Sequence, residues 1–274
     1  MGIKKWLVRL VLPVLCVVFA FSIYKLADIK VKQNTEQGSF YTLASSVEAL
    51  RRAETAEIDA WDMEGERSQT DAAGAEASEA QDQSVLPEYA LAYADNPDLF
   101  GWIRIEGTLV DYPVMYTPED GERYLHRAYD GSISQSGTPF IDAGCDPCGS
   151  FYLIYGHRMK SGTMFGTLPS YADRTYRDAH SIICFDTLYE RREYEVIAAF
   201  ASKIYGEDEV GFRYYEYTDL SEHKVFEEYM TGVMSSALYD TKAEISYGDE
   251  LITLSTCSYH TEDGRFVVVA KRIL

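Results

Sequence analysis

The sequence of 274 residues predicts a mostly β domain, a largely antiparallel barrel or sandwich, behind an apolar N-terminal segment and an acidic linker. About eight short apolar runs alternate with turn residues in the C-terminal part of the chain, and few helical patterns interrupt them. Charge is divided unevenly, with a net of +5 over residues 1–33 and −10 over residues 48–96, which predicts segments with different roles. A hydrophobic share of 46% excludes a disordered chain, and a net charge of −19 disfavours nucleic acid as a partner.

The N-terminal segment has the length and composition of a membrane-spanning helix. The residues from Leu10 to Tyr24 are uncharged and mostly apolar, and the run extends back to Trp6 with Arg9 as its single charge. A helix needs roughly 20 such residues to cross a bilayer. We therefore predict a cytoplasmic tip and a single-pass anchor over residues 1–30.

Basic residues on both sides of the apolar run bear on its orientation. Lys4 and Lys5 precede it, so the positive-inside rule puts the N-terminus in the cytoplasm and the rest of the chain on the extracellular side of the cell membrane. Three lysines that follow the run weigh against this orientation. The alternative is a signal peptide cleaved near Ala20-Phe21-Ser22, and both interpretations predict an exported protein.

Residues 31–85 are predicted to form a helical and acidic flexible linker. Apolar residues at partly helical spacing favour a weak helix over residues 39–60. From Met63 to Ser84 the chain has one large apolar residue, Met63, so this stretch cannot build a core. The folded domain is accordingly expected over residues 86–274.

The folded domain is expected to open with a short helix and two strands. Pro87 suits the first turn of a helix over 88–95, which Asn96-Pro97 ends. Strands over 101–105 and 110–114 are joined by a turn at Glu106-Gly107. A helix is predicted over 221–238, where apolar residues recur at three- and four-residue steps. The other strand candidates are 138–142, 151–155, 181–185, 193–202, 250–255 and 265–272.

A cysteine, an arginine and a histidine stand at predicted strand ends. Cys257 ends one strand and Arg265 opens the next, so a hairpin between them would bring the thiol and the guanidinium together at one edge. A guanidinium there favours the thiolate and can bind an oxyanion. His157 likewise follows a strand. These residue types suit a nucleophile, an oxyanion donor and an acid–base group, although each is more often structural when it occurs alone.

The other cysteines give weaker signals. Cys145 and Cys148 form a C-x-x-C pair, but the strand that follows disfavours a redox motif and no second ligand pair supports zinc. A local disulfide or two free thiols in a turn is favoured. Cys184 lies in an apolar strand and Cys16 in the apolar run, where both are expected to pack as small hydrophobic residues.

Several short motifs occur in order within residues 87–274. They are Gly101-Trp102-Ile103, Asp111-Tyr112-Pro113-Val114, Tyr124-Leu125, Gly137-Thr138-Pro139-Phe140-Ile141-Asp142, Tyr155-Gly156-His157, Met164-Phe165-Gly166, and Thr253-Leu254-Ser255-Thr256-Cys257 followed by Arg265. Together they resemble the sortase family of Gram-positive cysteine transpeptidases, and the class B branch fits best. The resemblance implies an eight-stranded sortase-type β-barrel with N-terminal helices and a helix inserted before the cysteine strand.

The same resemblance implies a membrane-anchored cysteine transpeptidase that needs no metal or cofactor. It would cleave the C-terminal sorting signal of an exported protein after a Thr, form a thioacyl enzyme, and transfer the protein to an amine of a peptidoglycan precursor or crossbridge. Class B relatives often recognise an Asn-Pro-x-Thr type of motif. His157, Cys257 and Arg265 match the catalytic residues of the family, and Leu125 and Ser255 match substrate contacts. The alternative is core packing for Leu125 and an ordinary strand residue for Ser255.

Two departures and three alternatives accompany this interpretation. Arg158 follows the histidine where many relatives have Asn or another polar residue, and the loop of Cys145 and Cys148 usually lacks cysteine. The alternatives are a pilin-polymerising sortase, a cysteine peptidase or hydrolase with the same three residues, and a non-catalytic membrane-tethered binding module.

Overall fold

The computed structural model describes residues 2–65, 84–258 and 261–274. The chain divides into two compact units, Met1–Tyr41 and Thr42–Leu274. Residues 66–83, which make up most of the stretch Met63–Ser84 within the predicted linker, lie outside the described residues, as do Tyr259 and His260.

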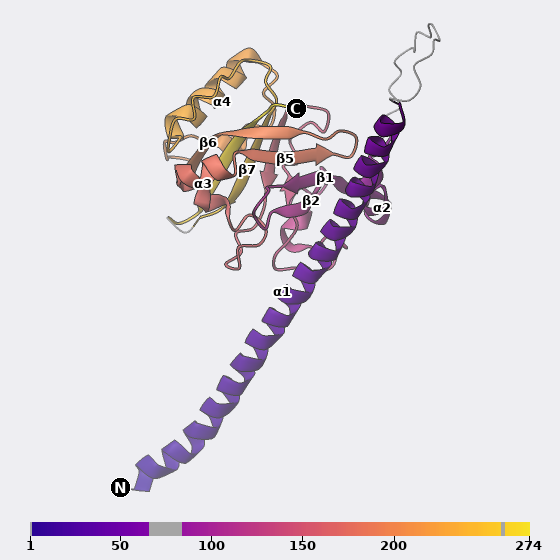
Figure 1. Ribbon diagram of the computed structural model, residues 1–274. Helices are drawn as coiled ribbons and strands as arrows, with labels where there is room; N and C mark the ends of the chain where they lie inside the picture. Colours follow the sequence, from indigo (N-terminus) through magenta and orange to yellow (C-terminus); the bar gives the residue numbers. More distant parts are fainter. Residues whose placement is uncertain (1, 66–83, 259–260) are drawn as a thin grey trace, which may run out of the picture. The chain divides into compact units, whose positions relative to one another are not determined.

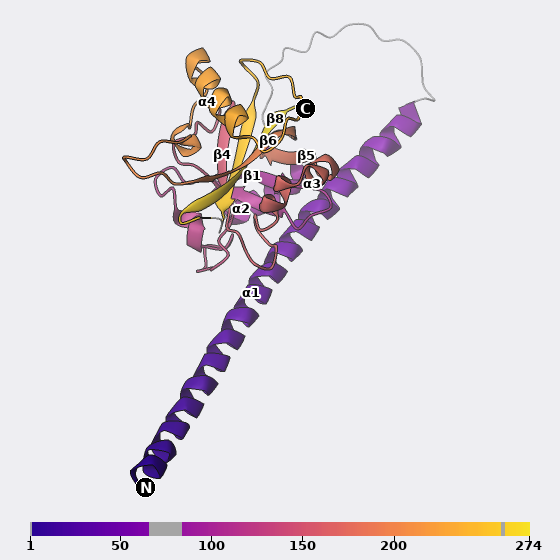
Figure 2. The same ribbon diagram turned by 90° about the vertical axis from the view of Figure 1, so that its left-hand side faces the viewer.

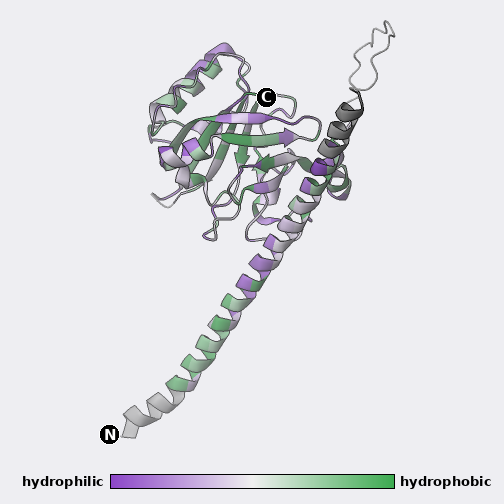
Figure 3. Ribbon diagram, in the orientation of Figure 1, coloured by the Kyte–Doolittle hydropathy of each residue, from purple (hydrophilic) through white to green (hydrophobic). Residues whose placement is uncertain are grey.

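The first unit is the N-terminal part of a single helix, α1 (Gly2–Gly65). Large apolar side chains between Val11 and Leu26 are exposed, and in Figure 3 the hydropathy colouring marks this stretch of the helix as mainly hydrophobic. Within the described residues α1 is the one helix long and apolar enough to cross a membrane. An 18-residue stretch of it has a mean hydropathy of 1.9, and none of that stretch is buried. The predicted anchor therefore falls on a helix of sufficient length.

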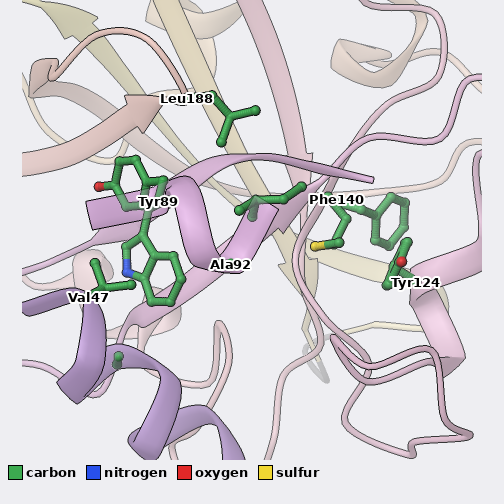
Figure 4. Packing of buried hydrophobic residues seen from close by; sticks show 10 residues of the cluster. Val47, Tyr89, Ala92, Tyr124, Phe140 and Leu188 are labelled. Atoms are coloured by element: carbon green, nitrogen blue, oxygen red, sulfur yellow. The ribbon is translucent and has the colours of Figure 1, made fainter. Parts of the chain in front are cut away.

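The second unit begins inside α1, earlier than the boundary at residue 86 that the sequence suggests. Ala44 and Val47 of α1 are buried in a core cluster with Tyr89 of α2 (Pro87–Asp95) and Trp102 (Figure 4). The rings of Tyr89 and Trp102 stack with their centroids 6.0 Å apart. Part of the segment expected as a linker thus belongs to the folded domain, because its apolar residues cover these two rings.

Eight strands close into a barrel in the order β1-β2-β3-β4-β7-β8-β6-β5 (Figures 1 and 2). Six neighbouring pairs are antiparallel, and β2–β3 and β4–β7 are parallel. The strands are β1 (Leu99–Arg104), β2 (Asp111–Met115), β3 (Phe140–Ile141), β4 (Phe151–Tyr155), β5 (Ile182–Thr187), β6 (Glu193–Lys203), β7 (Leu251–Cys257) and β8 (Gly264–Arg272). The prediction of an eight-stranded, mostly antiparallel barrel is confirmed, and the sandwich alternative is wrong.

Two predicted elements are shorter in the structure, because their ends make other hydrogen bonds. The strand expected over 138–142 is reduced to β3, since the amide of Thr138 donates to the carbonyl of Tyr124 outside the sheet. The helix expected over 221–238 is α4 (His223–Ser236). Ser221 is held in a turn by the carboxylate of Asp219, and the amide of Leu238 donates to the carbonyl of Ala199 in β6.

Short helices complete the barrel. They are η1 (Arg123–His126), η2 (Leu168–Ala172), α3 (Arg174–Ala179) and η3 (Tyr214–Glu216). The longer helix α4 packs on the outside of the barrel through a stripe of buried residues that includes Phe226 and Val233 (Figure 2). Its Tyr229 is fully buried and shares a 2.5 Å hydrogen bond with the hydroxyl of Thr253 in β7, so α4 is tied to the strand that carries Cys257.

Candidate active site

The parallel pair β4–β7 brings His157 and Cys257 to the same edge of the barrel. Tyr155 at the end of β4 pairs with Ser255 of β7, and the histidine and the cysteine lie two residues beyond these partners. Because adjacent parallel strands run in the same direction, their carboxyl ends meet at one edge of a sheet. The pairing therefore explains how residues 100 positions apart in the sequence come together.

The antiparallel pair β7–β8 puts Arg265 beside Cys257. The two residues are direct partners in the strand register, which confirms the hairpin expected from the sequence. Opposite residues of an antiparallel pair project to the same face, with Cβ atoms about 4.5–5.5 Å apart. The guanidinium Nη1 also donates to the carbonyl of Gly264 at 3.1 Å, so this side chain is held near the turn that joins the strands.

A cavity of about 510 Å³ opens at this edge and contains all five residues singled out from the sequence. The predicted catalytic residues Cys257, His157 and Arg265 line it, as do Leu125 and Ser255. Ile204 and Tyr215, from the long connection between β6 and α4, form another side of the cavity. The complete lining is Gly121, Glu122, Leu125, Phe140, Asp142, Ala143, Tyr155, Gly156, His157, Ile204, Tyr215, Ser255, Thr256, Cys257 and Arg265.

One hydrogen bond fixes which nitrogen of His157 carries the proton of the neutral ring. The Nε2 atom lies 2.7 Å from the carbonyl oxygen of Leu125. A carbonyl oxygen only accepts hydrogen bonds, so Nε2 is the protonated nitrogen and donates to it. The other nitrogen, Nδ1, is left to gain and lose the proton when the ring changes its charge.

The environment of His157 disfavours its charged form. Burial lowers the pKa of His157 below its ordinary value of 6.5, and the charge of nearby His126 acts in the same direction. The hydrogen bond to the Leu125 carbonyl opposes both effects by favouring the charged ring. A histidine with a pKa lowered in this way gives up its proton readily, which suits a general acid.

Backbone contacts on both sides of His157 fix its position. Gly156 donates its amide to the carbonyl of Ser255, and its own carbonyl accepts from the hydroxyl of Thr256 at 2.7 Å. The carbonyl of His157 accepts from the amide of Phe165. A Cβ on Gly156 would lie 2.6 Å from the Phe165 ring, so the residue before the histidine has to be glycine for this ring to pack.

The two residues predicted to contact a substrate, Leu125 and Ser255, also contact other residues of the chain. The hydroxyl of Ser255 lies 2.7 Å from the hydroxyl of Tyr214 in η3, and Ser255 is only 1% exposed. Leu125 offers its carbonyl to His157, while its half-buried side chain lines the cavity and packs against the core cluster. Direct contact of either residue with a substrate stays a prediction.

Two residues near the site are not predicted by the sequence analysis. Tyr214 caps Ser255 from a connection without a regular pattern, so nothing in the sequence indicates the contact. His126 stacks on His157, with ring centroids 5.6 Å apart and an angle of 28° between the rings. Its place directly after the Tyr124-Leu125 motif is the one sequence signal that pointed toward it.

The remaining cysteines of the second unit are free thiols away from this cavity. Cys145 is buried and accepts a hydrogen bond from the amide of Leu153, and burial raises its pKa to about 12. Cys148 is exposed beside a cavity of about 760 Å³ that contains none of the predicted catalytic residues. Burial also raises the pKa of Cys184, so Cys145 and Cys184 are poor nucleophiles.

Comparison with known proteins identifies relatives of the whole barrel. A family model described as a sortase domain matches residues 103–273. A sortase B of Listeria monocytogenes is 32% identical over 182 residues, which cover 65% of this chain and 71% of the relative. A sortase B of Staphylococcus aureus is 27% identical over 195 residues, covering 70% of this chain and 77% of the relative.

Solved structures with the same fold include two sortase B complexes. The structure of a Staphylococcus aureus sortase B–substrate complex matches with a TM-score of 0.70 and 21% identity, covering 89% of this chain and 98% of that chain. A Bacillus anthracis sortase B in complex with AAEK1 matches with a TM-score of 0.67 and 26% identity, covering 89% of this chain and 99% of that chain. Both matches therefore cover more of this chain than the barrel strands alone.

Proposed function

This chain belongs to the sortase family of cysteine transpeptidases, and we propose that Cys257, His157 and Arg265 carry its reaction. The observation that supports this assignment most strongly is the strand register. The parallel β4–β7 pair and the antiparallel β7–β8 pair bring a thiol, an imidazole and a guanidinium to one cavity. No other cysteine of the described residues lines that cavity.

In the first half of the proposed reaction, the Cys257 thiolate attacks the backbone carbonyl carbon after the Thr of a sorting motif. The carbonyl oxygen becomes an oxyanion, which Arg265 stabilises by donating hydrogen bonds. The tetrahedral intermediate then collapses, the peptide C–N bond breaks, and Nδ1 of protonated His157 gives its proton to the leaving amine. A thioacyl enzyme and a neutral imidazole remain.

In the second half, an amine attacks the thioacyl carbon and neutral His157 takes a proton from it at Nδ1. The C–S bond breaks, an amide forms, and the cysteine returns as a thiolate. The geometry supports this order, because the Nε2 bond to Leu125 leaves Nδ1 as the nitrogen that exchanges protons in both steps. The imidazole is therefore held in one orientation while its charge changes.

The proposed substrates are exported proteins with a C-terminal sorting signal, and the proposed acceptor is an amine of a peptidoglycan precursor or crossbridge. The Staphylococcus aureus relative is described in complex with a substrate. We further propose that the apolar part of α1 anchors the chain in the cell membrane, with the N-terminus in the cytoplasm and the barrel outside. The basic residues before the apolar run support this orientation.

Mass spectrometry tests the assignment directly. Full-length protein in detergent is incubated with peptides that contain Asn-Pro-x-Thr or Leu-Pro-x-Thr, with and without an added amine. A thioacyl adduct on Cys257, lost in Cys257→Ala and kept in the control Cys184→Ala, is the expected result. An adduct on another cysteine would overturn the choice of nucleophile.

The products then separate the candidate functions. An amide product formed only with the added amine supports transpeptidation. Cleavage at the same rate without any amine incorporation supports a cysteine peptidase instead. A preference for a peptide lysine over other amines would indicate a polymerising activity.

A further inference from the structure

The short helix η1 presents two consecutive groups to His157. The carbonyl of Leu125 accepts the hydrogen bond from Nε2, and the ring of His126 stacks on the imidazole with centroids 5.6 Å apart. The reaction described above uses the first group and leaves the second without a role. His126 is exposed to solvent and lies on the rim of the site rather than in the core.

The backbone of η1 is held firmly enough to direct the His126 ring. The carbonyl of Tyr124 accepts from the amide of Thr138, and the carbonyl of His126 accepts from the amide of Ser134, each at 3.0 Å. The connection closes tightly against η1 at Gly137, which has a φ of +60° and whose added Cβ would lie 2.6 Å from the Leu125 oxygen. Since the carbonyls of Tyr124 and His126 are both bonded to one loop, the backbone from which the stacked ring projects has a defined position.

Tyr124 fixes the same helix to the barrel. Its ring is buried, and its hydroxyl donates to the carboxylate of Asp98 at 2.9 Å and accepts from the side-chain amide of Asn96 at 2.8 Å. The Asp98 carboxylate also pairs with Arg123. These bonds therefore hold η1, and with it the backbone of His126, against the segment that joins α2 to β1.

We propose that His126 is a positioning residue for His157, holding the imidazole by stacking when neutral and opposing its protonation when charged. The proposal rests on the role proposed above for His157 as general acid and base. A neutral ring that covers one face of His157 restricts its rotation, which keeps Nδ1 directed toward the cavity. A second positive charge at this distance disfavours the imidazolium, so a charged His126 lowers the fraction of His157 that is protonated at a given pH.

Other charged or titratable groups surround His157 but do not stack on it. Cys257 comes from β7, Arg265 from β8, Glu122 from the residue before η1, Asp142 from the residue after β3, and Arg158 follows His157 directly. The two arginines keep their charge over the pH range in which histidines titrate. Among the described residues around this site, His126 is thus the neighbour that both stacks on His157 and can carry a positive charge.

Site-specific NMR titration of His157 in the full-length protein tests the coupling without any need for activity. Wild type is compared with His126→Phe, which keeps an aromatic ring but removes the charge, and with His126→Ala, which removes both. The expected result is a rise of the His157 midpoint by about half a unit to one unit in both variants. His223→Phe is the matched control, because His223 is also exposed and also contacts an aromatic ring, that of Tyr247, and it should leave the midpoint unchanged.

Peptide-transfer kinetics test the stacking. We expect kcat to fall about tenfold in His126→Ala and clearly less in His126→Phe, with KM similar in both, because the ring holds His157 rather than the substrate. Equal losses of kcat in the two variants would show that an aromatic ring at position 126 does not hold the His157 imidazole in place. A His157 midpoint that is the same in wild type and both variants would overturn the charge coupling.

Failure of the proposed function gives a different outcome from failure of this inference. If Cys257 forms no adduct with any peptide, the catalytic assignment fails, while the NMR midpoints still report whether His126 and His157 are coupled. If the adduct forms normally and the midpoints do not move, the catalytic assignment stands and the role of His126 is refuted.

Discussion

Replacing Gly156 by alanine adds one Cβ atom, which should displace the neighbouring His157, the proposed catalytic histidine. The new Cβ would lie 2.6 Å and 2.7 Å from two carbons of the Phe165 ring. Carbon atoms pack best about 3.5–4.0 Å apart, so either the ring or the backbone has to move by about 1 Å. Phe165 is fully buried and its amide donates to the carbonyl of His157, so the shift is passed on to the histidine.

The magnitude follows from the packing. Overpacking of a core costs about 1–3 kcal/mol of unfolding free energy, and a displacement of about 1 Å at a reacting group costs up to about 100-fold in rate. We therefore expect Gly156→Ala to unfold at lower denaturant concentration and to lower kcat by about 10- to 100-fold. Chemical denaturation and the peptide-transfer rate of full-length protein in detergent measure the two effects.

A second substitution separates steric crowding from a general loss of structure. Phe165→Leu shortens the crowding ring, so Gly156→Ala combined with Phe165→Leu should be more stable and more active than the sum of the single effects predicts. Gly206→Ala is the matched control, because its added Cβ would meet nothing closer than 3.8 Å and it has no positive φ. Wild-type kcat and stability in Gly156→Ala would refute the reasoning, as would purely additive effects in the double variant.

Three further predictions concern a guanidinium, a hydroxyl and a buried ion pair. Arg265→Met should lower kcat by about 100- to 1,000-fold through loss of the oxyanion donor, with partial recovery in Arg265→Lys, and single-turnover formation of the thioacyl adduct measures both. Tyr214→Phe leaves the buried hydroxyl of Ser255 without the partner now at 2.7 Å and should cost about 1–2 kcal/mol in chemical denaturation; no loss would show that the bond adds nothing. Arg51→Met removes the cation 3.0 Å from the buried carboxylate of Asp186 and should cost about 3–5 kcal/mol at pH 7. Burial raises the pKa of Asp186 above 3.8, so the folded state binds this proton more tightly than the unfolded state and stability falls as pH rises through that pKa. Loss of Arg51 should raise the pKa of Asp186 further. The unfolding free energy lost in Arg51→Met should therefore shrink in acid, where Asp186 is protonated, and a loss that grows in acid contradicts this account.

The sequence predicted the parts of the site that depend on neighbouring segments. Cys257 and Arg265 are separated by one short loop, so a hairpin was the natural expectation and the register confirms it. The position of His157 at a strand end was also predicted. Its closeness to Cys257 was not derivable from local pattern. The strands β4 and β7 are parallel neighbours in the sheet, but β5 and β6 lie between them in the chain. Such a pairing is decided by the packing of the whole sheet.

The contacts that the sequence analysis did not predict are tertiary. The segment that contains Ala44 and Val47 reads as a weak helix in a linker, because its apolar residues are few and its partners, Tyr89 and Trp102, lie far along the chain. His126 carries no pattern of its own. Its place beside His157 follows from the hydrogen bonds that Ser134 and Thr138 make to η1, which only the folded chain can form.

The arrangement around His157 suits the proposed use of one ring in both halves of a transpeptidation. The ring must accept and release a proton at one nitrogen while its other nitrogen stays fixed, and the Leu125 carbonyl holds Nε2 whether the ring is neutral or charged. Burial lowers the pKa of His157, which favours release of the proton to the leaving amine, and the carbonyl limits that shift so that the charged form remains accessible. Since η1 supplies this carbonyl and is itself bonded to Thr138 and Ser134, the proposed acid–base role of His157 depends on the connection between β2 and β3 as much as on the strands that carry the three proposed catalytic side chains.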